Sequence, residues 1–273
     1  MNKIKTSSKI YMAIIILFLY APILVLVFYS FNEANSTSVF TGFSLKWYGE
    51  LMKDTDTIQA LKNTLILAVT SSILATILGT AAAVGINAMR SKPIKTTVLT
   101  ATNIPMMNPD IVTGVSMMLL FVFLARLVGV TGVLGFSTLL IAHITFNLPY
   151  VILSVLPKFK QMDKHLSEAA QDLGCTPVQA FFHVILPSIM PGVFTGFIMS
   201  FTLSLDDFVI SYFTSGPEFQ TLPIRIFSMT KKRVTPDIYA LSTILFVVIL
   251  ILLLLINVSQ KRGENKKKVK KEI

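Results

Sequence analysis

Apolar residues in this chain gather in long runs, separated by shorter polar segments. Several runs reach the roughly 18–20 apolar residues that cross the ~30 Å hydrocarbon core of a bilayer. We place six such runs at residues 10–31, 61–88, 98–124, 133–156, 184–208 and 238–258. The pattern therefore predicts an all-α integral membrane protein in which residues 1–273 form a single transmembrane domain.

The composition agrees with a membrane protein. The chain is 53% hydrophobic and 14% charged, with a mean hydropathy of +0.70. A typical soluble domain carries about 25% charged residues, so a soluble enzyme, a secreted disulfide scaffold and a disordered chain are excluded. The run at 10–31 is longer than the roughly 7–15 apolar residues of a signal peptide, and no small-residue cleavage site follows it. We therefore expect this run to be retained as a span.

Lys and Arg residues are distributed unevenly between the loops. Sixteen fall on the side of the membrane that would hold both termini, and eight fall on the other side. An excess of Lys and Arg marks the cytoplasmic side, so both termini are predicted to be cytoplasmic. The basic tail at residues 259–273 is interpreted as a topology anchor near anionic lipid. Nucleic-acid binding is disfavoured because the tail has no interleaved aromatic residues.

The polar loop at residues 158–183 has the strongest local pattern. Apolar residues recur at i, i+3, i+4 and i+7 from Leu166 and predict a helix over residues 163–173. Gly174 follows, where a helix end commonly needs a left-handed residue. Thr176 then begins a capping-box sequence that predicts a second helix. Two short helices joined by a glycine form a compact knob that suits a groove on another protein.

The same loop contains residues at fixed spacing, namely Glu168, Ala169, Ala170, Gly174, Val184, Leu186 and Pro187. This order closely resembles the EAA loop of the membrane subunits of bacterial ATP-binding-cassette importers, with Val184 in place of the usual Ile. The resemblance implies the type I importer permease fold, with six transmembrane helices and a cytoplasmic coupling helix. In that family the loop docks into a cleft of the ATPase subunit and transmits its closure.

The chain has no Gly-x-x-x-x-Gly-Lys-Ser/Thr sequence with which to bind ATP phosphates. We therefore expect a non-catalytic subunit, with no catalytic residue, metal site or cofactor of its own. The single cysteine, Cys175, and three scattered histidines give no metal-ligand spacing. The resemblance implies a second homologous permease subunit, two ATPase subunits that bind ATP and Mg, and an extracytoplasmic binding protein, assembled at the bacterial cytoplasmic membrane.

Charged side chains within or beside membrane spans are costly and commonly functional. Asp206 and Asp207 follow Ser204 near the outer end of the fifth run, and Asp110 lies in the Pro-interrupted third run. The runs contain no Lys or Arg to neutralise these carboxylates, apart from any contribution by the loop residue Arg225. They favour a cationic substrate. The alternatives are a solvated helix end for the adjacent pair and a helix-breaking cap for Asp110.

The single tryptophan, Trp47, allows two interpretations. It is either an interfacial aromatic anchor or a ring that stacks on the alkyl chain or ammonium of a substrate at the pore mouth. His143 and Asn147, in the fourth run, are expected to hydrogen-bond between helices rather than to bind substrate.

Three further segments, at residues 204–208, 214–226 and 235–241, resemble the second permease subunit of spermidine/putrescine importers. Together with the EAA loop, they extend the resemblance over essentially the whole chain. It implies a polyamine-binding protein as partner and a substrate pathway that includes Trp47, Asp110, Ser204, Asp206 and Asp207.

Other functions stay open at this stage. An importer of the same class could carry ferric iron, thiamine or an anionic oxyanion, although lining carboxylates argue against the anion. A secondary transporter driven by an ion gradient through Asp110 would leave the EAA loop unexplained. A membrane-bound enzyme is disfavoured because the loops provide no nucleophile with a base and an orienting residue.

Overall fold

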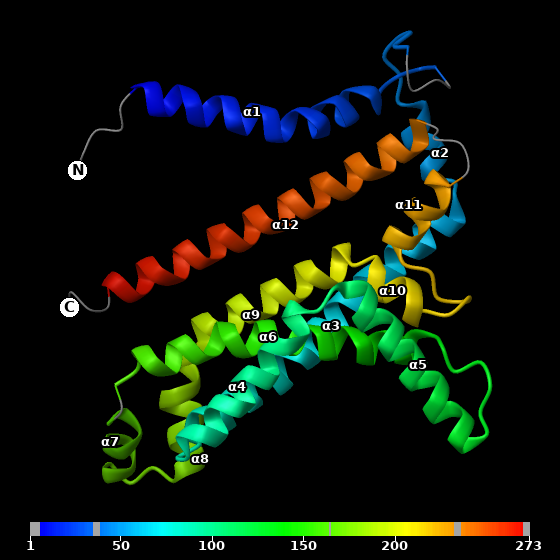
Figure 1. The fold of residues 1–273 in the computed structure, drawn as a ribbon. Helices are drawn as coiled ribbons and strands as arrows, with labels where there is room; N and C mark the ends of the chain where they lie inside the picture. Colours follow the sequence, from blue (N-terminus) through cyan, green and yellow to red (C-terminus); the bar gives the residue numbers. More distant parts are fainter. Residues whose placement is uncertain (1–5, 35–38, 164, 232–235, 270–273) are drawn as a thin grey trace. The chain divides into compact units, whose positions relative to one another are not determined.

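The computed structural model describes residues 6–34, 39–163, 165–231 and 236–269, and regular structure in these ranges is helical (Figure 1). The helices are α1 (Thr6–Tyr29), α2 (Lys46–Leu51), α3 (Thr55–Ala88), α4 (Lys92–Met107), α5 (Asp110–Val128), α6 (Phe136–Gln161), α7 (Leu166–Asp172), α8 (Pro177–Ala180), α9 (Leu186–Asp206), α10 (Val209–Thr214), α11 (Leu222–Thr230) and α12 (Pro236–Val269). A π-helical turn, η1 (Phe181–Ile185), joins α8 to α9.

The chain divides into two compact units, which are described separately. The first unit comprises Met1–Gln59 and Arg225–Ile273, and the second comprises Ala60–Ile224. The prediction of a single transmembrane domain stays a prediction. Part of the Lys and Arg asymmetry lies outside the described residues, at Lys3, Lys5, Lys164, Lys232, Arg233, Lys270 and Lys271.

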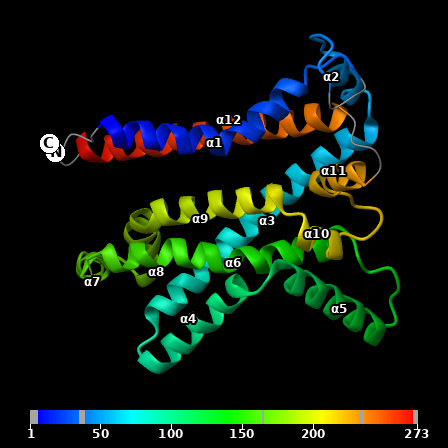
Figure 2. The ribbon, with the colours of Figure 1, turned by 45° about the horizontal axis from the view of Figure 1, so that its top comes forward.

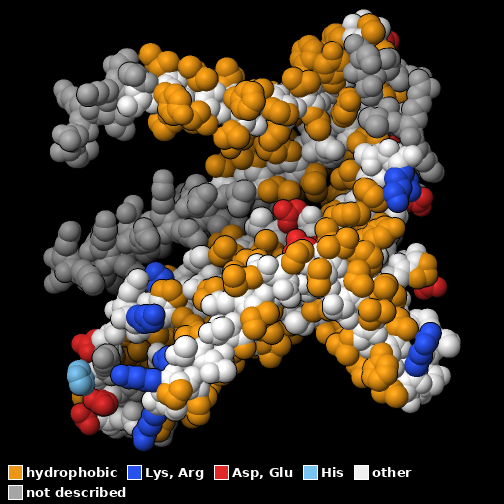
Figure 3. Space-filling view, viewed as in Figure 1, with side chains coloured by type: hydrophobic (Ala, Val, Ile, Leu, Met, Phe, Trp, Pro, Cys, Tyr) orange, Lys and Arg blue, Asp and Glu red, His pale blue; other side chains and the backbone are white. Residues whose placement is uncertain are grey.

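Five helical segments in the described part of the chain are long and apolar enough to cross a membrane. They are Ser8–Tyr29, Thr55–Ala88, Asp110–Val128, Phe136–Gln161 and Pro177–Asp206, and a shorter apolar helix covers Pro236–Ile251. Hydrophobic side chains cover most of the visible faces of α1 and α5 (Figure 3). The predicted all-helical membrane class is therefore confirmed.

The third predicted run, 98–124, is broken within its Pro-interrupted stretch and forms parts of two helices. The helix α4 ends at Met107, Asn108 is extended with ψ 141°, and α5 begins at Asp110. Pro109 causes the break, because proline lacks an N–H group and disfavours helical geometry in the residue before it. The membrane-length helix here is α5, and α4 is an additional helix with no buried residue.

The core of the second unit lies where α6 and α9 run side by side (Figures 1 and 2). Two glycines of α9 allow the close approach. A Cβ atom at Gly196 would lie 3.1 Å from the Val151 Cα atom, and one at Gly192 would lie 2.7 Å from the Ser154 carbonyl oxygen. The buried residues around this contact include Ala75, Val155 and Ile189. The α9 helix is therefore held firmly against α6.

In the first unit, α12 packs against α1 and α2. The loop between α1 and α2 is organised by the buried side chain of Asn32. Its Nδ2 atom donates to the Val39 carbonyl at 2.7 Å, and its Oδ1 atom accepts from the Thr41 N–H at 3.0 Å. These bonds satisfy buried polar groups that the loop would otherwise leave without partners.

Candidate functional site

The first candidate site is the knob formed by α7, Gly174, α8 and η1. Gly174 has φ +90°, and it follows α7 as the sequence predicts. The Cys175 N–H donates to the Ala170 carbonyl at 3.1 Å, and the Gly174 N–H donates to the Gln171 carbonyl at 2.9 Å. This pair of bonds is the Schellman arrangement that ends a helix at a left-handed glycine.

The second helix of the knob begins with the predicted capping box. The Thr176 hydroxyl accepts from the Gln179 N–H, and the Gln179 side chain accepts in return from the Thr176 N–H at 2.8 Å. The predicted start of the first helix, at residue 163, is wrong. Asp163 instead accepts from the His165 N–H at 3.0 Å, so the chain makes a turn there and α7 starts at Leu166.

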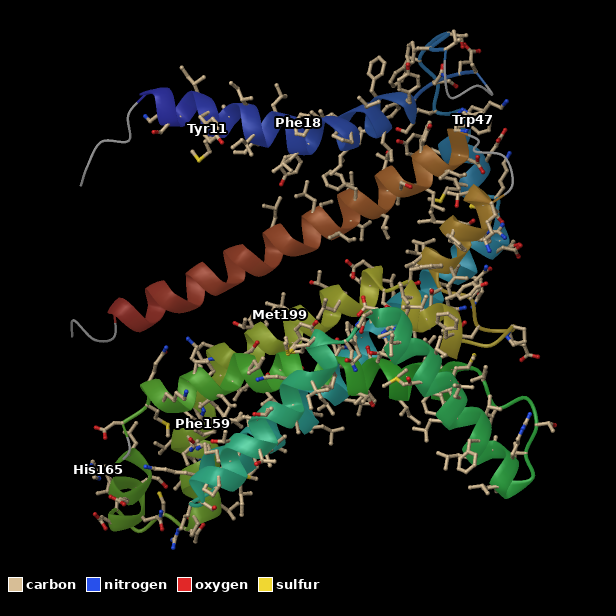
Figure 4. The ribbon with its side chains drawn as sticks, viewed as in Figure 1. Tyr11, Phe18, Trp47, Phe159, His165 and Met199 are labelled. Carbon is tan, nitrogen blue, oxygen red and sulfur yellow. The ribbon has the colours of Figure 1, made fainter. Side chains whose placement is uncertain are left out.

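The EAA residues occupy different positions on this knob. Ala170 is buried, whereas Ala169 and Glu168 are exposed, and the Glu168 carboxylate lies 2.9 Å from the His165 Nδ1 atom. Leu186 packs against the α6–α9 core, and Pro187 follows it in the first turn of α9. Figure 4 shows His165 at the end of the knob, where charged side chains gather (Figure 3).

Large apolar side chains on the knob are also exposed. The exposed fraction is 87% for Leu173, 66% for Val178 and 58% for Phe182. An apolar group on a short charged projection is typical of a surface that binds another protein. The knob therefore combines a locally determined shape with an uncovered contact surface.

The second candidate site is the break between α9 and α10. Asp207 adopts an extended conformation with ψ 122°, which ends α9 at Asp206. Its carboxylate accepts from the Ser211 N–H at 2.7 Å and from the Ile210 N–H at 3.3 Å. These are N–H groups of the first turn of α10, which a carboxylate stabilises.

A buried polar network lies behind this break. His143 of α6 places its Nδ1 atom 3.1 Å from Ser204 Oγ, and its Nε2 atom lies 3.0 Å from Ser211 Oγ and 3.5 Å from Asp207 Oδ2. The Asn147 Nδ2 atom donates to Ser204 Oγ at 2.8 Å. The expectation that His143 and Asn147 hydrogen-bond between helices is confirmed.

Ser204 is the centre of this network. Besides the two contacts from α6, its hydroxyl lies 2.9 Å from that of Ser71 on α3. The Ser204 side chain is buried, so it joins three helices through hydrogen bonds. The contacts of Ser204 in the structure are with other helices, and its place on a substrate pathway stays a prediction.

Two of the predicted pathway carboxylates are exposed. Asp206 is exposed at the end of α9, and Asp110 is exposed at the start of α5. Gly114, one turn after Asp110, lies close enough to α10 that a Cβ atom there would be 3.4 Å from the Ile210 Cα atom. The fold therefore brings the first turns of α5 and α10 together within the second unit.

Trp47, in the first unit, is buried at the start of α2, and its position is labelled in Figure 4. Its Nε1 atom donates to the Asn32 carbonyl at 2.8 Å, which fixes the indole ring against the α1–α2 loop. The ring also borders a small cavity of about 250 Å³ with Glu50, Asp54 and Asp237. Trp47 therefore has a clear structural contact, and a role in substrate binding stays a prediction.

Sequence reasoning missed one ion pair in the first unit. The Arg225 guanidinium lies 3.1 Å from the Asp54 carboxylate and 3.5 Å from that of Asp56. Burial raises the pKa of Asp54, but the Thr57 hydroxyl and Arg225 outweigh it and hold that pKa below its usual value. The partners are 171 positions apart, so no local spacing could have indicated the contact.

An all-helical chain with several membrane-length helices and a projecting helical knob has the features of a polytopic membrane transport subunit. The sequence model of a family described as "Binding-protein-dependent transport system inner membrane component" matches residues 75–268. The chain belongs to this family.

Similar proteins include two from Escherichia coli. The chain is 42% identical over 231 residues to the putrescine transport system permease protein PotI, covering 84% of this chain and 81% of that protein. It is 40% identical over 242 residues to the spermidine/putrescine transport system permease protein PotC, covering 88% of each. The resemblance predicted from the sequence is confirmed.

A solved structure shares the fold. It is the crystal structure of a bacterial ABC transporter involved in the import of the acidic polysaccharide alginate. The match has a TM-score of 0.74 with 18% sequence identity and covers 94% of both chains. At this identity the likeness establishes the importer permease fold alone.

Proposed function

We propose that this chain is the permease subunit of an ATP-driven importer that moves putrescine and spermidine across the bacterial cytoplasmic membrane by alternating access. The observation that carries the proposal is its identity of 40–42% to two polyamine permeases over more than four-fifths of its length. Iron and thiamine importers are the alternatives within the same class.

The charges near the α9–α10 break support a cationic cargo. Among the described residues, Lys and Arg pair with Glu50, Asp54 and Asp56, and with neither Asp110 nor Asp206. An exposed carboxylate without a basic partner attracts an ammonium group, and attraction is stronger where the local dielectric is low. We assign Asp110 and Asp206 to the substrate pathway.

The knob supports the coupling role that the EAA resemblance implies. Its exposed Leu173, Val178 and Phe182 would enter the cleft of an ATPase subunit, and Glu168 would lie at the edge of that contact. Movement of the knob would pass through η1 to α9. Because α9 packs closely on α6, the two helices would move together.

We propose the full assembly that the EAA resemblance implies. This chain would pair with a second permease subunit and two ATPases, and the ATPases would hold ATP and Mg. An extracytoplasmic binding protein would deliver the cargo, since the family is described as binding-protein-dependent, and we expect that protein to bind polyamines. This subunit would be non-catalytic, with both termini in the cytoplasm.

The test is uptake of labelled putrescine and spermidine by cells that lack their own polyamine importer and express the complete operon with this chain. We expect saturable uptake that disappears when this chain is omitted and that neither thiamine nor ferric iron inhibits. Uptake of thiamine or iron without polyamine uptake would overturn the cargo assignment. Polyamine uptake without the ATPase subunits would overturn the importer class.

A further inference from the structure

The two adjacent carboxylates at the end of α9 have opposite surroundings. Asp206 is exposed, and its carboxylate interacts with its own backbone N–H and with the neighbouring charge of Asp207. The side chain of Asp207 is only 7% exposed. Neighbouring residues that differ this much in burial are unsuited to the same task.

The Asp207 carboxylate is held by groups of α10 and α6. It accepts from two N–H groups in the first turn of α10, at 2.7 Å and 3.3 Å, from the position before the N-cap residue Phe208. The His143 ring lies on its other side, at 3.5 Å. A carboxylate whose oxygens are committed in this way has little capacity left for a cargo ammonium.

His143 links three helices around this carboxylate. Its ring nitrogens contact Ser204 on α9 and Ser211 on α10, while the residue itself belongs to α6. It is fully buried, and α10 also packs against α5, which begins with Asp110. A fixed His143 therefore fixes both the end of α9 and the start of α10.

We infer that Asp207 and His143 are positioning residues that hold the α9–α10 break, and that Asp206 is the carboxylate that meets the cargo. The inference rests on the proposed function for the identity of that cargo. The direction in which Asp206 projects is set by the point at which α9 stops. Asp207 sets that point by capping α10, and His143 keeps Asp207 in place.

The two roles are separable because asparagine is about as good a helix cap as aspartate but carries no charge. In Asp206→Asn we expect the KM for polyamine uptake to rise on the order of tenfold, because one charge contact is lost. In Asp207→Asn we expect uptake to fall by no more than about threefold, since the amide oxygen can still accept from the Ser211 N–H, the shorter of the two bonds.

Removal of the cap should have a different signature. In Asp207→Ala and His143→Ala we expect the maximal rate of uptake to fall while the KM stays nearly constant. Hydrogen–deuterium exchange of the purified importer complex should also become faster at the α10 amides, Ser211 above all. Thr145→Val is the matched control on α6, because in the described part of the chain the Thr145 hydroxyl bonds to the Ile141 carbonyl of its own helix and to no other helix.

A rise in KM for Asp207→Asn as large as that for Asp206→Asn, with slow exchange at α10, would overturn the inference. Unchanged α10 exchange in Asp207→Ala and His143→Ala would overturn it as well. If the alanine variants fail to accumulate in the membrane, the KM values of the two asparagine variants still test whether Asp206 and Asp207 have different roles. If the parent complex moves neither polyamine, the proposed cargo fails, while the exchange measurements still test the positioning role.

Discussion

The knob and the α9–α10 break belong to the same unit but are ordered by different means. The knob is shaped by residues a few positions apart, through the Gly174 turn and the Thr176 capping box. The break is shaped by residues from distant helices, which meet at Ser204 and His143. One region is exposed and locally encoded, and the other is buried and depends on the whole bundle.

This difference separates two kinds of functional surface. A region that must fit a partner gains from a shape that its own sequence fixes before contact, because less conformational entropy is then lost on binding. A region that must present a charge inside a membrane needs its buried polar groups satisfied by several helices. The following changes test that distinction, from the largest expected effect to the smallest.

The largest effect is expected for Gly174→Val. The residue has φ +90°, and nothing lies within 4 Å of the place where a Cβ atom would stand, so the cost is conformational. A β-branched residue in the left-handed region costs roughly 1–2 kcal/mol. We expect uptake to fall at least about tenfold, because 1.4 kcal/mol corresponds to a factor of ten.

The matched variant for this change is Gly174→Asn, because asparagine tolerates the left-handed region. Uptake and ATPase stimulation by cargo-loaded binding protein should be measured at equal membrane levels. Equal losses in the two variants would show that the backbone turn at Gly174 is not what couples the knob to its partner.

Ser204→Ala tests the buried region. It leaves the Asn147 amide and a His143 ring nitrogen without their partner at the centre of the network. We expect the importer complex to lose about 1–2 kcal/mol of stability, because hydrogen bonds between helices in membranes reach values of this order. Thermal unfolding in detergent measures the loss.

Ser188→Ala is the control for that change. The Ser188 hydroxyl donates to the Val184 carbonyl four residues earlier, at 2.7 Å, so its removal should leave the helix–helix contacts intact. A loss in this variant as large as in Ser204→Ala would mean that a missing hydroxyl, rather than the network, accounts for the effect.

Thr176→Ala removes one half of the capping box on the knob. Loss of an N-cap hydroxyl costs about 1 kcal/mol of local helix stability. We expect faster amide exchange in α8 with unchanged stability of the α6–α9 core. Thr176→Ser should restore slow exchange, and a core that unfolds earlier in Thr176→Ala would contradict the local character of the knob.

The smallest effect is expected for Arg225→Gln, which tests a long-range contact that is partly open to solvent. Arg225 and Asp54 are both partly exposed, so the pair contributes at most about 1 kcal/mol. The lowered pKa of Asp54 means that the pair stabilises the fold above the usual range of an aspartate and loses this contribution as the pH falls through the lowered value.

The stability difference between Arg225→Gln and its parent should therefore be present at neutral pH and shrink in acid. Thermal unfolding of the parent and variant complexes, at neutral and at acidic pH, measures this stability difference at the two pH values. A difference that is equal at the two values would show that Asp54 is not the group through which Arg225 acts.

The sequence alone indicates the parts of this molecule that short-range rules govern. It predicts the apolar helices, the left-handed turn at Gly174 and the cap at Thr176, each of which depends on neighbours within a few residues. It indicates the Pro-induced interruption within 98–124, but it does not give the ends of the two helices on either side of it. A window average cannot detect where one helix stops and another begins.

The unlike roles of Asp206 and Asp207 are beyond prediction for a different reason. Adjacent carboxylates look equivalent in a sequence, and only the fold places His143 beside one of them. The Arg225 ion pair is similar, since its partners are far apart in the chain. Contacts of this kind require the tertiary structure.

The π-helical turn η1, Phe181–Ile185, also sets an angle. A π turn holds one residue more than an α-helical turn, and each residue rotates an α-helix by about 100°. The same residues wound as an α-helix would therefore turn the knob by roughly that angle about the axis of α9. The π-helical winding of this short segment thus determines the direction in which the knob meets its partner.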